Sequence, residues 1–177
     1  MSDSILSRPG VLLDVHGHGV LLQGDSGVGK SDLALGLVAR GHRLVADDLV
    51  EFQCCGGELH GRCRSGFEGM LEISGLGLIN LKQLYGEGAV CASVALTLVL
   101  TLEPGLSRDY DGLQPVAIDW RLLDVAVPAW RLPYSNQRDM PLLVETALRL
   151  NRARQQGYDA CSDLQSRLSS LLHKGAA

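Results

Sequence analysis

The sequence predicts an α/β fold with a central, largely parallel but mixed sheet, a β-hairpin near the N-terminus and helices near the C-terminus. Three observations support this class. Residues 24–31 (GDSGVGKS) match the phosphate-binding loop pattern G-x-x-x-x-G-K-[ST]. A short apolar run precedes this loop, and apolar residues at helical spacing follow it. Residues 94–102 form the strongest strand pattern in the chain. Strand, loop and helix therefore follow the order of a P-loop nucleotide-binding domain.

Short apolar runs bounded by glycine or other turn residues predict the strands. They lie at residues 11–16, 19–23, 43–46, 49–54, 58–62, 70–73, 94–102 and 122–127. Gly17-His18 and Gly56-Gly57 separate neighbouring runs, so each pair predicts a β-hairpin. Most of the glycine-rich stretch 64–80, and residues 104–116, are expected to be loops.

Apolar residues at helical spacing predict the helices. They lie at about residues 30–40, 81–85 (a short helical turn), 139–156 and 162–172. Asp139 can cap the third helix, with Pro141 in its first turn. Ser162 and Gln165 form a possible capping box for the last helix. The last helix carries a leucine stripe typical of a core or subunit contact. We expect residues 1–177 to form a single domain, with a P-loop core at about 9–160 and C-terminal helices at about 139–172.

Composition limits the class of protein. A net charge of −4, without a basic stripe that aromatic residues interrupt, argues against nucleic acid as a partner. The longest apolar stretch, residues 89–102, is too short for a membrane helix, and no secretory signal is visible. The five cysteines lack C-x-x-C spacing, which argues against a cysteine zinc site or a disulfide framework. We therefore expect a reduced, cytoplasmic protein. His16, His18 and His60 flank hairpin turns and are expected to be exposed.

The phosphate-binding loop predicts the position of a nucleotide triphosphate such as ATP. Glycine permits turns in which backbone N–H groups surround a phosphate, and the following helix points its positive end at the same place. Lys30 would contact the β- and γ-phosphates, and the Ser31 hydroxyl would be a ligand of Mg²⁺. The expected nucleotide-binding residues are Gly24, Asp25, Ser26, Gly27, Val28, Gly29, Lys30 and Ser31.

Asp47-Asp48, at the end of the strand 43–46, adds acid–base chemistry to this loop. In phosphate-loop enzymes a carboxylate at the end of a neighbouring strand holds Mg²⁺ directly or through water. With two adjacent carboxylates, one can steer the metal while the other accepts a proton from the attacking hydroxyl. Crowding of like charges can raise the pKa of one of them. The alternative is a solvated turn in which neither residue has a role.

Four segments resemble a known family. They are residues 24–31, 41–48 (GHRLVADD), 71–80 (LEISGLGLIN) and 145–160, and they are similar to the HPr kinase/phosphorylase catalytic domain. The resemblance covers most of residues 9–160 and includes an uncommon glycine-rich block. It implies an enzyme that uses ATP to phosphorylate a serine of the small phosphocarrier HPr. Many members of the family also reverse this reaction, with inorganic phosphate as the attacking group.

The resemblance implies a role for each matching position. Lys30 would contact the phosphates, and Ser31 together with Glu72 would hold Mg²⁺. Asp48 would accept the proton during phosphorylation and donate it in the reverse direction, with Asp47 assisting. The resemblance also implies a homohexamer in which the C-terminal helices and neighbouring subunits shape the HPr site. It further implies a short form without the N-terminal domain of many relatives.

The chain departs from the family pattern mainly at cationic positions. Ser74 stands where the glycine-rich block of the family carries arginine, and Gly112 replaces the arginine of a Tyr-Asp-Arg-Leu-Gly segment. The family loop Pro-Val-Arg-Pro-Gly-Arg aligns with residues 133–138, where only the first proline and Arg138 match. Arg138 is therefore an expected catalytic residue. Because cations stabilise a charged transition state, we expect an intact kinase core and weakened phosphorylase activity.

Three functions fit these observations. The first is an ATP- and Mg²⁺-dependent protein-serine kinase that acts on HPr or an HPr-like carrier. The second is a diverged kinase of a small hydroxylated metabolite, which would explain the altered substrate-side loop at residues 130–138. The third is a nucleotide-binding regulatory module without turnover.

Overall fold

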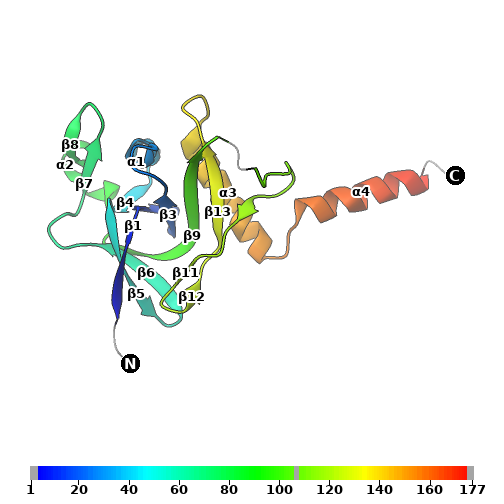
Figure 1. Cartoon of the computed structure of the whole chain (residues 1–177), viewed down its shortest axis with the longest axis horizontal. Coiled ribbons are helices and arrows are strands. Elements are labelled where there is room, and N and C mark those ends of the chain that lie inside the picture. The colour runs from blue at the N-terminus through cyan, green and yellow to red at the C-terminus, as the bar shows by residue number, and fades with distance from the viewer. Residues whose placement is uncertain (1–3, 106–107, 175–177) are drawn as a thin grey trace.

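The computed structural model describes residues 4–105 and 108–174, and a mixed sheet dominates it (Figure 1). Within these residues the sheet has nine strands in the order β1-β5-β6-β9-β3-β2-β4, and β13 joins β9 to β10. The strands of this sheet are β1 (Ile5–Pro9), β2 (Val11–Val15), β3 (His18–Gln23), β4 (Arg43–Ala46), β5 (Leu49–Cys55), β6 (Glu58–Cys63), β9 (Ser93–Pro104), β10 (Val116–Ala117) and β13 (Ala129–Tyr134). Strands β3 and β13 run parallel to β9, whereas β2 is antiparallel to β3. The predicted α/β class with a mixed sheet is confirmed, but the expectation of a largely parallel sheet is wrong, because hairpins and edge strands make most of its pairs antiparallel.

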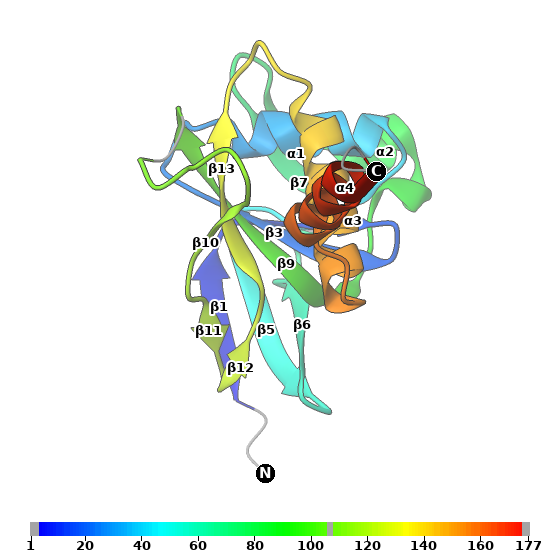
Figure 2. The same cartoon turned by 90° about the vertical axis from the view of Figure 1, so that its right-hand side faces the viewer.

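Smaller elements and helices surround the sheet. Two further hairpins are β7 (Met70–Ile73) with β8 (Gly77–Asn80) and β11 (Arg121–Leu122) with β12 (Val125–Ala126). The helices are α1 (Lys30–Ala39), α2 (Leu81–Tyr85), the short 3-10 helix η1 (Glu87–Ala89), α3 (Met140–Gln155) and α4 (Ala160–Lys174). Figure 1 shows α4 projecting away from the rest of the chain, and in Figure 2 the same helix points toward the viewer.

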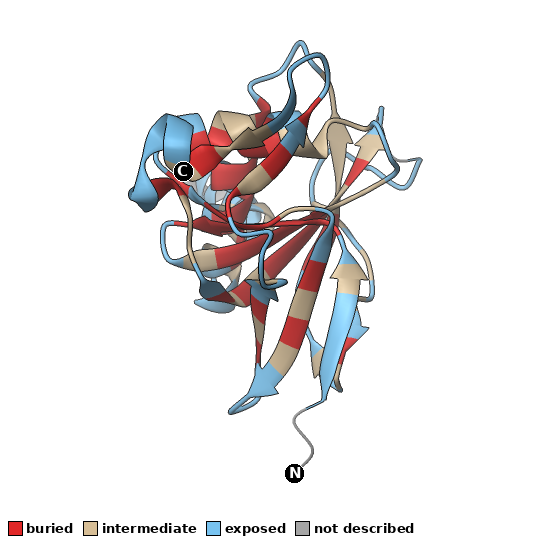
Figure 3. Ribbon diagram, turned by 90° about the vertical axis from the view of Figure 1, so that its left-hand side faces the viewer, coloured by how far each residue is buried: buried red, intermediate tan, exposed pale blue. Residues whose placement is uncertain are grey.

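Both faces of the central strands are buried, because alternate residues of β2 and β3 face two different cores. Leu13 and Leu22 belong to the core that packs α1 and α3 against the sheet. Leu12 and Leu21 belong to the core on the opposite face, which includes Phe52 of β5. Figure 3 shows the buried residues gathered in the middle of the sheet. The two cores therefore fix the turn after β3, which is the phosphate-binding loop.

The predicted segments before and after α1 are confirmed. Strands β2 and β3 form the expected hairpin into the loop, and β5 pairs with β6 as the second hairpin. Helix α1 ends before Gly41, whose φ of 93° suits glycine. Asp139 caps α3 by accepting a hydrogen bond of 3.0 Å from the N–H of Leu142, and Pro141 lies in the first turn as predicted.

Two predictions near the C-terminus are wrong. Residues 122–127 are not one strand but parts of β11 and β12, because Leu123 and Asp124 both adopt positive φ and reverse the chain between them. The capping box of α4 does not form, because the helix begins before Ser162. Instead, a carboxylate oxygen of Asp159 accepts hydrogen bonds from the N–H and the hydroxyl of Ser162, at 3.1 and 2.7 Å.

Strands β1, β8, β10 and β13 have no counterpart in the sequence prediction. Strand β13 occupies the start of residues 130–138, so the expected substrate-side loop is confined to the residues between β13 and α3. Of the loop predicted at residues 104–116, residues 108–115 contain no helix or strand. Residues 106 and 107 lie outside the described part of the chain.

The leucine stripe of α4 is not part of a core within the chain. Leu164, Leu168, Leu171 and Leu172 are between 52 and 76% exposed. The subunit contact expected of this stripe stays a prediction. No helix in the described residues combines the length and apolar character needed to cross a bilayer. All five cysteines are free thiols.

Candidate active site

The phosphate-binding loop holds a backbone that requires glycine. Gly24, Gly27 and Gly29 have φ values of 136°, 81° and 105°. A Cβ on Gly24 would lie 2.6 Å from the carbonyl oxygen of Leu102 at the end of β9. A Cβ on Gly29 would lie 2.5 Å from the ring and hydroxyl of Tyr134 at the end of β13. The ends of two parallel strands therefore press directly against the loop.

The loop presents donors and a cation at one point. Helix α1 begins at Lys30, and Gly29 before it has no side chain to cap the free N–H groups of the first turn. The ammonium group of Lys30 donates hydrogen bonds of 2.8 Å to the carbonyl oxygens of Gly24 and Asp25. The loop thus gathers a positive charge and a helix N-terminus, which together favour a phosphate group.

The end of β4 and the β7–β8 hairpin bring three carboxylates to the same place. The N–H of Glu72, on β7, donates to one carboxylate oxygen of Asp47 at 3.4 Å. The other oxygen, Oδ1 of Asp47, is buried and has no hydrogen-bond partner among the described residues. Asp48 follows in an exposed, left-handed conformation with a φ of 64°. An unsatisfied buried carboxylate oxygen of this kind is suited to a cation.

Burial raises the pKa of Asp47 above its ordinary value. The N–H of Glu72 opposes this shift, and the negative charge of Asp48 adds to it. Crowding of like charges, predicted as the cause of a raised pKa in this pair, is therefore a smaller effect than burial.

A pocket of about 250 Å³ joins the loop to the carboxylates. Among its lining residues are Lys30, Ser31, Asp47, Asp48 and Glu72, so the structure brings together the predicted phosphate, metal and proton-transfer groups. The remaining lining residues are Ser26, Gly27, Gly29, Asp32 and Ser74. The hydroxyl and carboxylate oxygens of this pocket are the donor types that Mg²⁺ prefers.

Arg138 does not line this pocket. It lines a separate cavity of about 340 Å³, which also contacts Trp130 and Leu143. This structure therefore does not place Arg138 in the phosphate pocket, and its expected catalytic role stays a prediction. A contact that the sequence did not reveal comes instead from Tyr134, whose ring lies against Gly29. No local pattern signals it, because β13 and the loop are far apart in the chain.

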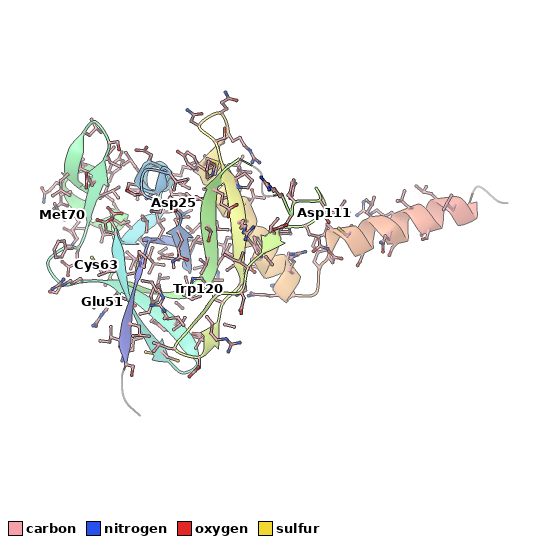
Figure 4. All side chains as sticks on the ribbon, viewed as in Figure 1. Asp25, Glu51, Cys63, Met70, Asp111 and Trp120 are labelled. Atoms are coloured by element: carbon pink, nitrogen blue, oxygen red, sulfur yellow. The ribbon has the colours of Figure 1, made fainter. Side chains whose placement is uncertain are left out.

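A second cavity of about 400 Å³ adjoins the pocket and shares Asp47, Asp48 and Glu72 with it. Its other side is mainly apolar and includes Phe67 and Met70. Figure 4 places Met70 and Cys63, which also lines this cavity, on the same side of the molecule as the β7–β8 hairpin. The carboxylates therefore stand between a polar pocket and an apolar cavity.

A model of the HPr Serine kinase C-terminal domain family matches residues 4–168. The chain belongs to this family. It is 42% identical over 171 residues to the HPr kinase/phosphorylase of Treponema pallidum, a match that covers 95% of this chain and 54% of that protein. It is 43% identical over 163 residues to the HPr kinase/phosphorylase of Caldanaerobacter subterraneus, covering 90% of this chain and 53% of that protein. The chain spans about half the length of these curated relatives.

A solved structure carries the same family fold. The Hpr(Ser) kinase/phosphatase from Coxiella burnetii superposes with a TM-score of 0.81 at 32% sequence identity. The match covers 90% of this chain and 98% of that chain. Membership of the HPr Serine kinase family, expected from the four matching segments, is therefore confirmed.

Proposed function

We propose that this protein is an ATP- and Mg²⁺-dependent protein-serine kinase that phosphorylates HPr or an HPr-like carrier. The observation that carries the proposal is the pocket in which Lys30 and Ser31 face Asp47, Asp48 and Glu72. Family membership supports the same activity, since the matched relatives are named HPr kinase/phosphorylase. The proposed nucleotide-binding residues remain those of the loop 24–31.

Asp48 is the proposed general base. It is exposed and lines both the phosphate pocket and the adjoining cavity, so it lies between the nucleotide side and the acceptor side. The serine hydroxyl attacks the γ-phosphorus of ATP, the bond to the β-phosphate oxygen breaks, and the hydroxyl proton passes to Asp48. Lys30 and the N-terminus of α1 stabilise charge on the phosphates.

Ser31 and Glu72 would hold Mg²⁺, with Asp47 completing the oxygen-rich side of the pocket. Bound Mg²⁺ neutralises phosphate charge and orients the transferred group. The unpartnered Oδ1 of Asp47 supports a cation close to this oxygen. The N–H of Glu72 holds the other oxygen of Asp47, which fixes the carboxylate before substrate arrives.

The apolar cavity beside Asp48 favours a protein acceptor over a small hydroxylated metabolite. Leu49, Phe67, Met70 and Leu78 give it an apolar contact surface that a protein acceptor can cover and a sugar or polyol cannot use. Apolar side chains near an acceptor serine would fit such a surface.

The phosphorylase direction is proposed to be weak. Among the described residues that line the phosphate pocket, Lys30 is the sole cation, and Ser74 stands where the resemblance to the family implies arginine. Fewer cations give less stabilisation to attacking inorganic phosphate. The exposed leucines of α4 support the proposal of a homo-oligomer, a homohexamer by resemblance, in which this helix contacts another subunit.

Incubation with labelled ATP, Mg²⁺ and HPr tests the proposal. Transfer to an HPr serine is expected, and Lys30→Ala should abolish it. ATP turnover that a small metabolite stimulates and HPr does not would support the metabolite kinase. Tight ATP binding with no transfer to any acceptor would support the regulatory module instead.

A further inference from the structure

A buried ionic cluster lies at the end of α1 away from the phosphate-binding loop. Glu145, on α3, is 7% exposed and His42, just before β4, is 3% exposed. The Nε and Nη2 groups of Arg40 donate to the two carboxylate oxygens of Glu145 at 2.9 Å each. His42 Nε2 lies 2.8 Å from Oε1 of the same carboxylate.

A second histidine completes this cluster from the β2–β3 turn. The ring of His16 meets that of His42 edge to face, with the ring centroids 4.6 Å apart. One nitrogen of each ring and one carboxylate oxygen of Glu145 all lie within 4.8 Å of one another. His16 is exposed, so one side of the cluster opens to solvent.

We propose that His16, His42 and Glu145 form a binding site for a transition-metal dication, Zn²⁺ being the ion that best fits the donors. Two imidazoles and one carboxylate are a common zinc ligand set, with water in the fourth position. Mg²⁺ is a poor competitor, because it prefers oxygen ligands in octahedral geometry. The site is separate from the proposed Mg²⁺ ligands Ser31 and Glu72.

Small movements adapt the cluster to the metal. Tetrahedral zinc with bonds of about 2.0–2.1 Å sets neighbouring ligand atoms roughly 3.3 Å apart. His42 Nε2 and Oε1 of Glu145 must therefore separate by about half an ångström, while exposed His16 moves inward. Each carboxylate oxygen can accept more than one bond, so Arg40 can keep its contacts with Glu145. The positive charge of Arg40 lowers the affinity of the site for a cation but does not prevent binding.

The hydrogen bonds of the cluster decide which proton has to move when a metal binds. Glu145 accepts two hydrogen bonds from Arg40, which hold its carboxylate in place. Because His42 Nε2 lies at hydrogen-bond distance from the same carboxylate, a proton on that nitrogen has to move to Nδ1 before the metal binds there.

Calorimetric titration of the chelator-treated protein with Zn²⁺, in excess Mg²⁺, tests this site. We expect one equivalent to bind and the affinity to fall in His16→Gln by at least about 10–100-fold, the usual cost of changing a residue that only supports a metal ligand. His18→Gln is the matched control, since His18 lies on the same hairpin outside the cluster, and its affinity should equal that of the unaltered protein. Zn²⁺ should also raise the unfolding temperature of the unaltered protein but not of His16→Gln.

The free cysteines are the competing zinc ligands. Substitution of the adjacent, exposed Cys54 and Cys55 by serine should leave the zinc affinity unchanged, and Co²⁺ should bind without a thiolate charge-transfer band. Equal zinc affinity in His16→Gln and the unaltered protein would overturn the proposal. So would loss of binding in the cysteine variant, or no binding at all.

Discussion

The two ends of α1 lie beside carboxylates in opposite environments. Beside its N-terminus, Asp47 has one oxygen with no hydrogen-bond partner among the described residues, and burial raises its pKa. Beyond its C-terminus, Glu145 has hydrogen bonds from Arg40 and His42, and its pKa falls to about 2. A buried charge is stable only where partners replace water. The carboxylate at the C-terminal end therefore stabilises the fold even without a ligand, whereas the one at the N-terminal end has a partner for both oxygens only when a ligand binds.

Asp48→Asn should give the largest effect, and it should lower kinase activity without changing stability. If Asp48 is the general base, kcat falls by about 10²–10⁴-fold. Asparagine tolerates the left-handed backbone of this position, so the free energy of unfolding should stay within about 0.5 kcal/mol. Kinase assays and denaturant unfolding check the two expectations. An unchanged rate of phosphorylation would remove Asp48 from the mechanism.

Glu145→Gln, beyond the C-terminal end of α1, should lower the stability of the fold. Removing the charge leaves Arg40 and His42 with a weaker partner, and the expected loss is about 3 kcal/mol of unfolding free energy. The folded pKa of about 2 lies below the ordinary 4.5. The stabilisation is therefore complete above pH about 4.5 and disappears as the pH falls toward 2.

Urea unfolding of the unaltered protein and of Glu145→Gln across this pH range measures that difference. The two stability curves should converge in acid. A constant gap from pH 7 to pH 2 would show that the loss comes from packing rather than from the ionised carboxylate.

Gly29→Ala tests how tightly the loop is held by β13. The new methyl group meets the Tyr134 ring, and the φ of 105° is strained for any side chain, so about 1–3 kcal/mol of stability should be lost. Gly27→Ala is the comparison, since a Cβ there has open space although its φ is also positive. Thermal unfolding should rank Gly29→Ala as the less stable variant. Equal losses would mean that backbone strain alone matters.

Asp47→Asn should have the smallest effect and the opposite sign. A raised folded pKa means that the ionised carboxylate destabilises the fold, increasingly as the pH rises above 3.8 and through the folded value. Asparagine removes this penalty, so a gain of about 0.5–1 kcal/mol at pH 7 is expected, with lower kinase activity. Denaturant unfolding at pH 7 measures it. A loss of stability would show that the ionised form is favoured after all.

Local sequence patterns were sufficient to predict the helices and strands around the candidate active site. The hairpin β2–β3, α1 and β4 follow from apolar spacing and glycine punctuation, which act within a few residues. Asp47 and Asp48 meet the loop because β4 ends beside it. For Glu72, the resemblance to the kinase family supplied what spacing did not, since its place depends on a hydrogen bond to Asp47.

Long-range contacts explain what the sequence did not reveal. Strand β1 is largely exposed and carries Ser7, Arg8 and Pro9, so it lacks a hydrophobic pattern and depends on pairing with β5. Strand β13 contains Pro133, which lacks a backbone N–H and so argues against a strand within a sheet. The sequence therefore did not predict its pairing with β9. The position of Arg138 depends on where the chain turns between β13 and α3, and no local signal encodes that distance from the loop.

The left-handed backbone of Asp48 limits which residues can replace it during evolution. Glycine, asparagine and aspartate are among the residues that adopt such a φ most readily. Genetic drift at this position therefore leads most easily to Asn or Gly, and both discard the acidic group without disturbing the surrounding architecture. A descendant with asparagine at this position would keep the phosphate-binding loop and lose the proposed proton acceptor.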